Sequence, residues 1–138
     1  MTCFATLLLL LAASLQAQKA IDPDKIRQFN VTINQEDQIV KTQILKNPKR
    51  VQLDNDATYT WYTANQLVET RGGYDGRLLH GYYKAFFFNN QLRESGQMRY
   101  GLRQGKWRYW YSNGNLREII SWKKGRKHGL YAIYNDQG

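Results

Sequence analysis

The sequence predicts an all-β fold in which β-hairpins stack side by side into one elongated antiparallel single sheet. Three features predict it: alternation of aromatic and polar residues, an Asn-Gly dipeptide after the clearest alternating run, and regularly spaced glycines. Within residues 106–111 an aromatic residue occupies every second position, the period of a half-buried strand. Asn113 and Gly114 follow at once, and this dipeptide favours the type I′ turn of a two-residue hairpin loop.

The first residues have the pattern of a secretory signal peptide. An apolar run at 7–11 is followed by small residues, and we expect cleavage after Ala17, which makes residues 1–17 the signal peptide. The run is too short to span a bilayer as a helix. The alternative to a signal peptide is a buried N-terminal helix. Cys3, the single cysteine of the chain, would be removed with this segment. The mature chain is therefore predicted to have no disulfide, no thiolate nucleophile and no cysteine-ligated metal.

Residues 18–57 carry the weakest pattern. Phe29, Val31 and Ile33 alternate with polar residues, which favours one short strand, and Pro48 favours a turn. We interpret residues 18–57 as an N-terminal adapter that caps one end of the sheet, because a terminal repeat otherwise leaves a strand edge open.

Residues 58–138 form the predicted repeat domain. Glycines recur at equal intervals, at positions 81, 105 and 129, and an aromatic residue follows each of them two and five positions later. The five-residue links 101–105 and 125–129 are predicted to connect the hairpins tightly. A degenerate first repeat begins near Thr58, which gives about three and a half hairpins. The last hairpin is either truncated at the C-terminus or ends the sheet with a short edge strand. The structural repeat positions are Gly81, Tyr83, Phe86, Gly105, Trp107, Trp110, Gly114, Leu116, Gly129, Tyr131 and Tyr134.

This pattern resembles the MORN repeat, and above all its bacterial variant, the antitoxin component of YwqK-type toxin–antitoxin systems. The family motif is roughly G-x-W-x-x-Y-x-x-N-G-x-L, followed by a polar strand and N-G-K-x-x-G. It is matched at Gly105, Trp107, Trp110, Asn113, Gly114, Leu116, Gly125 and Gly129. The resemblance implies a stack of hairpins that acts by binding, either as a scaffold at an envelope surface or by covering a toxin.

The positive charge is concentrated in the second half of the chain. The net charge is +9. Residues 1–75 contain eight Lys or Arg and eight Asp or Glu, whereas residues 76–138 contain twelve basic and three acidic residues. Such an excess favours anionic partners, although it also keeps a protein soluble.

The predicted hairpin separates packed from polar side chains. A two-residue turn pairs Trp107 with Ile120 and Trp110 with Arg117. Trp107 then lies on the packed face, and Arg117 lies opposite Trp110 on the other face. That second face is either a candidate binding face or a set of cross-strand pairs that only stabilises the sheet. With the following basic run, the candidate binding residues are Lys106, Arg108, Trp110, Arg117, Lys123, Lys124, Arg126 and Lys127.

We find no catalytic or metal-binding pattern, and we expect no cofactor. His80 and His128 each precede a repeat glycine, where the middle repeat has Gln104. A position that accepts Gln is expected to be a turn residue, and no three or four ligands are spaced for a metal.

The sequence therefore predicts an exported protein, periplasmic, envelope-associated or secreted, that is not an enzyme. We expect a binding or scaffold module whose partner is a protein or an anionic envelope component, such as lipid or an acidic polymer. An antitoxin or immunity-type protein is the alternative, and an enzyme is a distant one. Nucleic acid is disfavoured, because exported proteins rarely meet it and no RNA-binding signature is present.

Overall fold

The computed structural model describes residues 26–46 and 51–138, which form nine strands and no helix. The predicted signal peptide, with Cys3 and Ala17, and the turn at Pro48 lie outside the described residues. The strands are β1 (Gln28–Asn34), β2 (Ile39–Leu45), β3 (Thr58–Thr63), β4 (Gln66–Arg71), β5 (Arg77–Phe86), β6 (Leu92–Arg99), β7 (Leu102–Trp110), β8 (Leu116–Lys123) and β9 (Arg126–Ile133).

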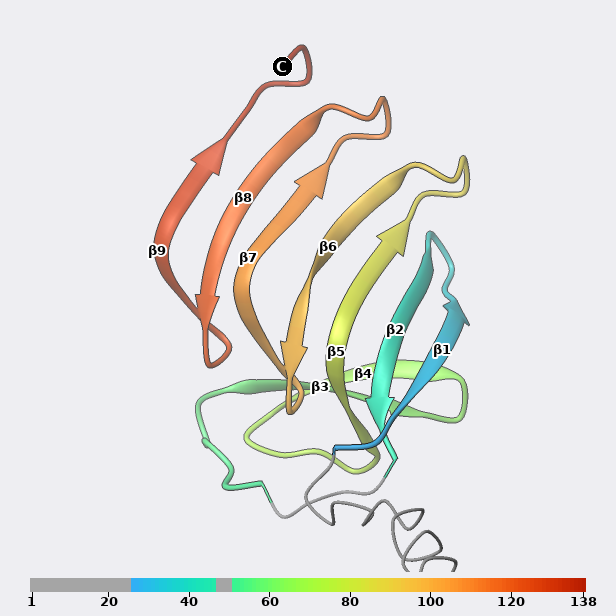
Figure 1. Ribbon diagram of the computed structural model, residues 1–138, viewed down its shortest axis with the longest axis vertical. Coiled ribbons are helices and arrows are strands. Elements are labelled where there is room, and N and C mark those ends of the chain that lie inside the picture. Colours follow the sequence, from blue (N-terminus) through green and yellow to red (C-terminus); the bar gives the residue numbers. More distant parts are fainter. Residues whose placement is uncertain (1–25, 47–50) are drawn as a thin grey trace, which may run out of the picture.

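Seven of these strands lie side by side in the order β1-β2-β5-β6-β7-β8-β9 (Figure 1). All their pairings are antiparallel. This confirms the predicted all-β sheet of stacked hairpins. The hairpin β3–β4 leaves the row and lies across its lower end, where β3 pairs briefly with the start of β5 through Trp61–Leu78 and Tyr62–Arg77.

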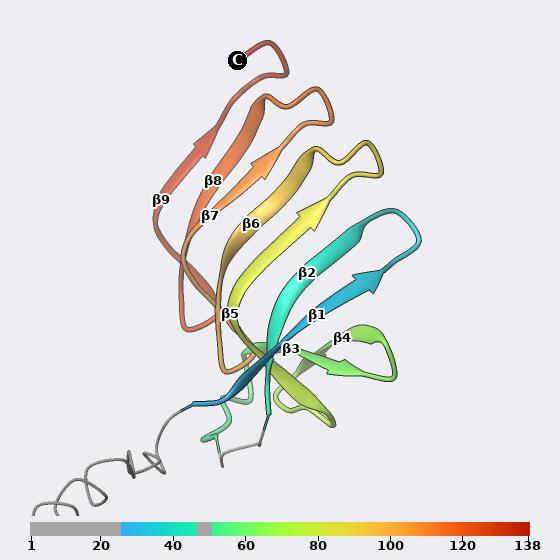
Figure 2. The same cartoon turned by 45° about the vertical axis from the view of Figure 1, so that its right-hand side comes forward.

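The predicted adapter lies in the row of stacked strands, and the predicted first repeat lies outside that row. β1 and β2 come from the adapter segment, yet β2 pairs with β5 and extends the sheet. β3 and β4 come from the degenerate repeat near Thr58, and they form a hairpin as expected. That hairpin does not stack next to β5 but folds over the concave face of the sheet, which we call the inner face (Figure 2).

The repeat glycines lie inside strands and bend them. Gly81, Gly105 and Gly129 all have positive φ, and at each the pairing with the preceding strand shifts register. A bulge of this kind increases local twist and bends the strand, which accounts for the bowed strands of Figure 1. The five-residue links predicted from the sequence are therefore wrong, because each tight connection is a two-residue turn, such as Tyr100-Gly101, and the following residues already belong to the next strand.

The turn at Gly114 differs from the prediction. Gly114 has a φ of 91°, as expected, but Asn113 is not in the positive-φ region, so the turn is not type I′. The Gly114 N–H donates to the Tyr111 carbonyl at 3.0 Å, and the Tyr111 N–H donates to the Asn115 carbonyl at 2.8 Å. These bonds close a three-residue loop, a type I turn followed by a glycine in a G1 bulge.

The tips of successive hairpins are linked by asparagine side chains. The Asn89 amide donates to the Ser112 carbonyl at 3.2 Å, and the Asn113 amide donates to the Asp136 carbonyl at 2.9 Å. The donors Asn89 and Asn113 are one full repeat apart in the sequence, and so are the acceptors Ser112 and Asp136, so the same contact occurs in successive repeats. The repeat thus orders the loops as well as the strands.

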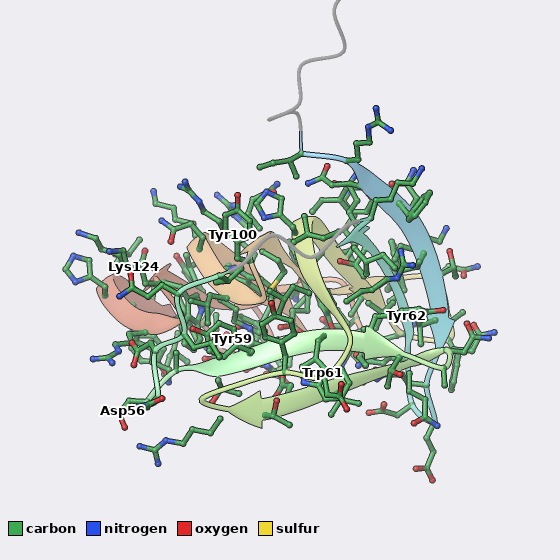
Figure 3. All side chains as sticks on the ribbon, turned by 90° about the horizontal axis from the view of Figure 1, so that it is seen from below. Asp56, Tyr59, Trp61, Tyr62, Tyr100 and Lys124 are labelled. Atoms are coloured by element: carbon green, nitrogen blue, oxygen red, sulfur yellow. The ribbon has the colours of Figure 1, made fainter. Side chains whose placement is uncertain are left out.

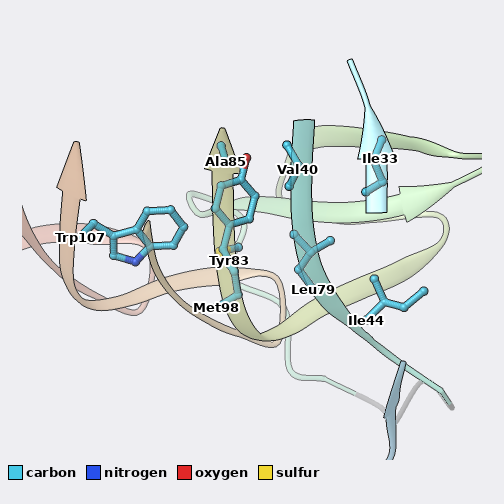
Figure 4. Close-up of a cluster of buried hydrophobic side chains, with 8 residues drawn as sticks. All are labelled: Ile33, Val40, Ile44, Leu79, Tyr83, Ala85, Met98 and Trp107. Carbon is cyan, nitrogen blue, oxygen red and sulfur yellow. The ribbon is translucent and has the colours of Figure 1, made fainter. Parts of the chain in front are cut away.

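The main core lies on the inner face beneath β3–β4 (Figure 4). Trp107 is fully buried, and its ring meets the Tyr83 ring at a centroid distance of 5.2 Å. The Trp107 indole lies over Gly96, where a Cβ atom would overlap it. Tyr62 and Leu67 of the β3–β4 hairpin pack against this cluster. The remaining buried members are Ile33, Val40, Ile44, Leu79, Ala85 and Met98.

Candidate functional site

The predicted binding residues do not form a single face. Lys106 and Arg108 are exposed on the outer face of β7, opposite the buried Trp107. Lys123, Lys124, Arg126 and Lys127 are exposed at the lower end of the sheet, around the β8–β9 turn. The sequence-predicted cations are therefore divided between the outer face and the lower end.

Arg117 belongs to neither group, and its predicted pairing is wrong. The three-residue loop shifts the register between Tyr109 and Trp110, so Trp110 pairs with Leu116 instead of Arg117. The Arg117 guanidinium lies 5.8 Å from the centroid of the Tyr109 ring, and its Nε lies 3.2 Å from a Glu118 carboxylate oxygen. Arg117 thus contacts the packed side of the hairpin.

A basic groove of about 780 Å³ opens at the lower end of the sheet. Its cations are Arg99 at the end of β6 and Lys123 and Lys124 at the end of β8. Its apolar lining includes Tyr100, Leu102 and Leu53, and Leu53 is 44% exposed. Figure 3 shows this end from below, with Tyr100 and Lys124 projecting from neighbouring turns. We call this the basic groove.

Two equivalent turns hold the cations of the groove. Tyr100-Gly101 and Lys124-Gly125 have positive φ at both positions, as a type I′ turn requires, and they occupy the same place in successive repeats. The Lys124 N–H donates to the Gln104 side-chain oxygen at 3.1 Å, and the Gly125 N–H donates to the Arg103 carbonyl at 3.0 Å. The second turn is thereby fixed against the strand that leaves the first.

The residues before β3 form the other wall. The Asp54 N–H donates to the Tyr59 hydroxyl at 2.8 Å, and the Asp54 carboxylate lies 2.9 Å from the Arg126 guanidinium. The Asp56 N–H donates to the same carboxylate, and this hydrogen bond, followed by the charge of Arg126, lowers the pKa of Asp54. Asp54 offsets the charge of Arg126. Among the described residues, no carboxylate lies within 4.0 Å of Arg99, Lys123 or Lys124.

The two histidines do not meet a pair of acids. His80 accepts a hydrogen bond from the Tyr100 N–H at its Nδ1 atom, at 3.0 Å, and burial lowers its pKa. Of the residues that the structure describes, none in the lining of the cleft around His80 is acidic, and Asp54 is the one acidic residue in the lining of the cleft around His128. Within residues 26–46 and 51–138, no three His, Cys, Asp or Glu residues cluster as metal ligands would. In the same ranges no helix is long and apolar enough to cross a membrane.

The inner face holds a second set of polar groups that the sequence analysis did not select. Arg103 lies between two indoles, with its guanidinium carbon 4.8 Å from the Trp107 centroid and 5.2 Å from the Trp122 centroid. It also forms an ion pair with Glu94 at 3.2 Å. Burial raises the pKa of Glu94, and the charge of Arg103 opposes that shift.

A sequence signal for Arg103 does exist. Arg103 and Lys127 each stand two positions after a turn glycine, and Lys127 lies 6.0 Å from Trp122 and 5.8 Å from Tyr131. A cation that recurs at the same position of successive repeats, on aromatic-rich strands, predicts a cation–aromatic contact. No comparable signal marks Leu53 or Arg99 as parts of the groove, because the groove is built by segments far apart in the chain.

Comparison of the chain with protein-family models, with curated proteins and with solved structures finds no match in any of the three.

Proposed function

We propose that the protein is a non-catalytic binding module at the cell envelope that holds an anionic envelope component in the basic groove. The observation that carries this proposal is the convergence of Arg99, Lys123 and Lys124 on one groove that is also lined by the exposed Leu53 and the half-buried Tyr100. Three cations beside apolar side chains suit a ligand that carries negative charge next to apolar groups. The location at the envelope rests on the predicted signal peptide, and the binding role rests also on the resemblance to MORN repeats.

The groove is favoured over the outer face as the binding surface. On the outer face, Lys106 and Arg108 extend from the middle of a strand. At the lower end, two turns and the segment before β3 surround a concave space. A concave site brings several charges to one ligand, whereas Lys106 and Arg108 extend from a single strand that surrounds no such space.

The test compares two charge reversals of equal size. Binding of the full chain is measured by co-sedimentation with vesicles of phosphatidylglycerol and phosphatidylcholine, and with phosphatidylcholine alone. The double variant Lys123→Glu/Lys124→Glu should bind the anionic vesicles at least about tenfold more weakly. The control variant Lys106→Glu/Arg108→Glu carries the same change in net charge on the outer face and should stay within about twofold of the unmodified chain.

A parallel measurement with a soluble acidic polysaccharide distinguishes a lipid headgroup from an acidic polymer as the source of the negative charge. In either case binding should weaken as salt rises. Equal losses in the two variants would contradict the proposed groove, and salt-independent binding would contradict an anionic ligand.

A further inference from the structure

His80 of β5 holds one of the two turns that form the basic groove. Its Nδ1 atom accepts the hydrogen bond from the Tyr100 N–H at 3.0 Å. The His80 and Tyr100 rings are also in contact, with their centroids 4.5 Å apart. Arg99 and Tyr100 line both the cleft around His80 and the basic groove. A change at His80 can therefore reach the groove through this turn.

The equivalent turn one repeat later is held by a glutamine. Gln104 follows His80 by one full repeat, as Lys124 follows Tyr100. The Lys124 N–H donates to the Gln104 side-chain oxygen at 3.1 Å, which is the same contact as that between Tyr100 and His80. The other bond of each turn, from its glycine N–H to a strand carbonyl, repeats as well. The two side-chain contacts thus differ in the chemistry of the acceptor.

The two acceptors respond differently to acid. A neutral imidazole accepts a hydrogen bond at one nitrogen, whereas a protonated imidazole donates at both. His80 can therefore hold the Tyr100 N–H only while its ring is neutral. The amide oxygen of Gln104 does not titrate and remains an acceptor. Protonation of His80 removes one bond of the Tyr100-Gly101 turn and leaves the contact between Gln104 and Lys124 in place.

The surroundings of His80 favour the neutral ring. Of the described residues that line its cleft, Arg99 of β6 is charged and Tyr100 is the other titratable group, while those from β5, β7 and the segment before β1 are uncharged. Burial, followed by the charge of Arg99, lowers the pKa of His80. Because these lining residues include no carboxylate that would stabilise an imidazolium, the contact with Tyr100 is complete near neutral pH and is lost in acid.

We infer that His80 is a pH-sensitive positioning residue of the basic groove. Neutral His80 fixes Arg99 and Tyr100 for binding, and protonated His80 releases them, so the groove holds its anionic ligand near neutral pH and releases it in acid. This inference rests on the proposed function of the groove. Its direction is opposite to that of charge alone, because an added positive charge beside Arg99 would strengthen the binding of an anion.

Exchanging the two acceptors tests this role. Co-sedimentation of the full chain with vesicles of phosphatidylglycerol and phosphatidylcholine is measured at pH 7.5 and pH 5, where the phosphate diester keeps its charge. The ratio of the affinity at pH 7.5 to that at pH 5 should be at least about threefold larger for the unmodified chain than for His80→Gln, since one hydrogen bond is at stake. Gln104→His places a second titratable acceptor at the Lys124 turn and should increase the ratio further.

NMR of the isotope-labelled chain without vesicles follows the turn itself. The Tyr100 amide signal should titrate together with the His80 ring, and it should not titrate in His80→Gln. Three results would overturn the inference while vesicle binding persists. They are equal affinity ratios for the unmodified chain and His80→Gln, a smaller ratio for the unmodified chain, which would indicate that His80 acts through its charge, or a Tyr100 amide that does not titrate with His80. A lack of vesicle binding by the unmodified chain at pH 7.5 would instead contradict the proposed function, and this inference with it.

Discussion

Strands β7 and β9 carry the same repeat motif, yet the protein packs them differently. Trp107 and Tyr131 occupy equivalent positions, each the second residue after a bulge glycine. Trp107 is fully buried, whereas Tyr131 is 54% exposed. Trp107 has a neighbouring strand on each side and the Tyr83 ring against its face, whereas among the strands of residues 26–46 and 51–138 Tyr131 has a neighbour, β8, on one side only. The motif therefore determines the strand and its bend, and the neighbours determine how much free energy the aromatic residue contributes.

The largest expected difference between the two strands is in the effect of removing these aromatic rings. Trp107→Ala leaves a cavity in the main core and removes the hydrogen bond from the indole N–H to the Gln97 carbonyl, so it should lower the free energy of unfolding by about 3–5 kcal/mol. Tyr131→Ala, the matched variant, should cost less than about 1 kcal/mol, because its ring is already half in water. Urea unfolding followed by tryptophan fluorescence or circular dichroism measures both. Similar losses would contradict the unequal packing.

The next effect concerns the glycine beneath Trp107. Gly96→Ala would place a methyl group inside the indole of Trp107, and we expect a loss of about 1–3 kcal/mol in the free energy of unfolding. Gly105→Ala is the control: a Cβ there meets no atom, and only the strain of its positive φ remains, about 1 kcal/mol. The same urea titrations compare them. A Gly96→Ala variant as stable as the unmodified chain would show that Trp107 does not pack over this glycine.

The smallest expected effect is a pH dependence from Glu94, which stands opposite Tyr109 of β7 and forms an ion pair with Arg103. Burial raises the pKa of Glu94 in the folded chain above its value in the unfolded chain. The folded state therefore binds the proton more tightly, and this contribution to stability is complete at low pH and disappears as pH rises through the raised pKa. Relative to Glu94→Gln, the unmodified chain should lose stability between pH 4 and pH 7. Urea unfolding at both pH values measures it. A relative gain would mean that the ion pair with Arg103 outweighs burial.

The hairpins could be predicted from the sequence because the residues that determine each strand and its turn are close together in the chain. The pairings of Trp107 with Ile120, Arg108 with Ile119 and Tyr109 with Glu118 all follow from a period of two, and the structure confirms them. The prediction was wrong next to the turn, where a type I turn with a G1 bulge holds one more residue than a type I′ turn. Because of that additional loop residue, Arg117 does not pair with Trp110, and its guanidinium lies over the Tyr109 ring instead.

The placement of β3–β4 could not be predicted, because its local pattern resembles that of the stacked hairpins. Contacts far apart in sequence decide it: the Thr60 N–H donates to the Gly101 carbonyl at 2.8 Å, and Trp61 pairs with Leu78. The basic groove has the same origin. Its lysines belong to a basic run that is visible in the sequence, but its other wall depends on the contact between Asp54 and Arg126, 72 positions apart.

Amide hydrogen exchange resolved by residue tests most directly whether β7 is enclosed and β9 is open. In β7, amides pointing to either side have a partner strand, so the exchange of Arg108 and Tyr109 should be slow for both. In β9 the rates should alternate: Ala132 and Tyr134 should be protected by β8, while Tyr131 and Ile133 should exchange at least about tenfold faster. Uniform protection along β9, equal to that of β7, would contradict the open edge.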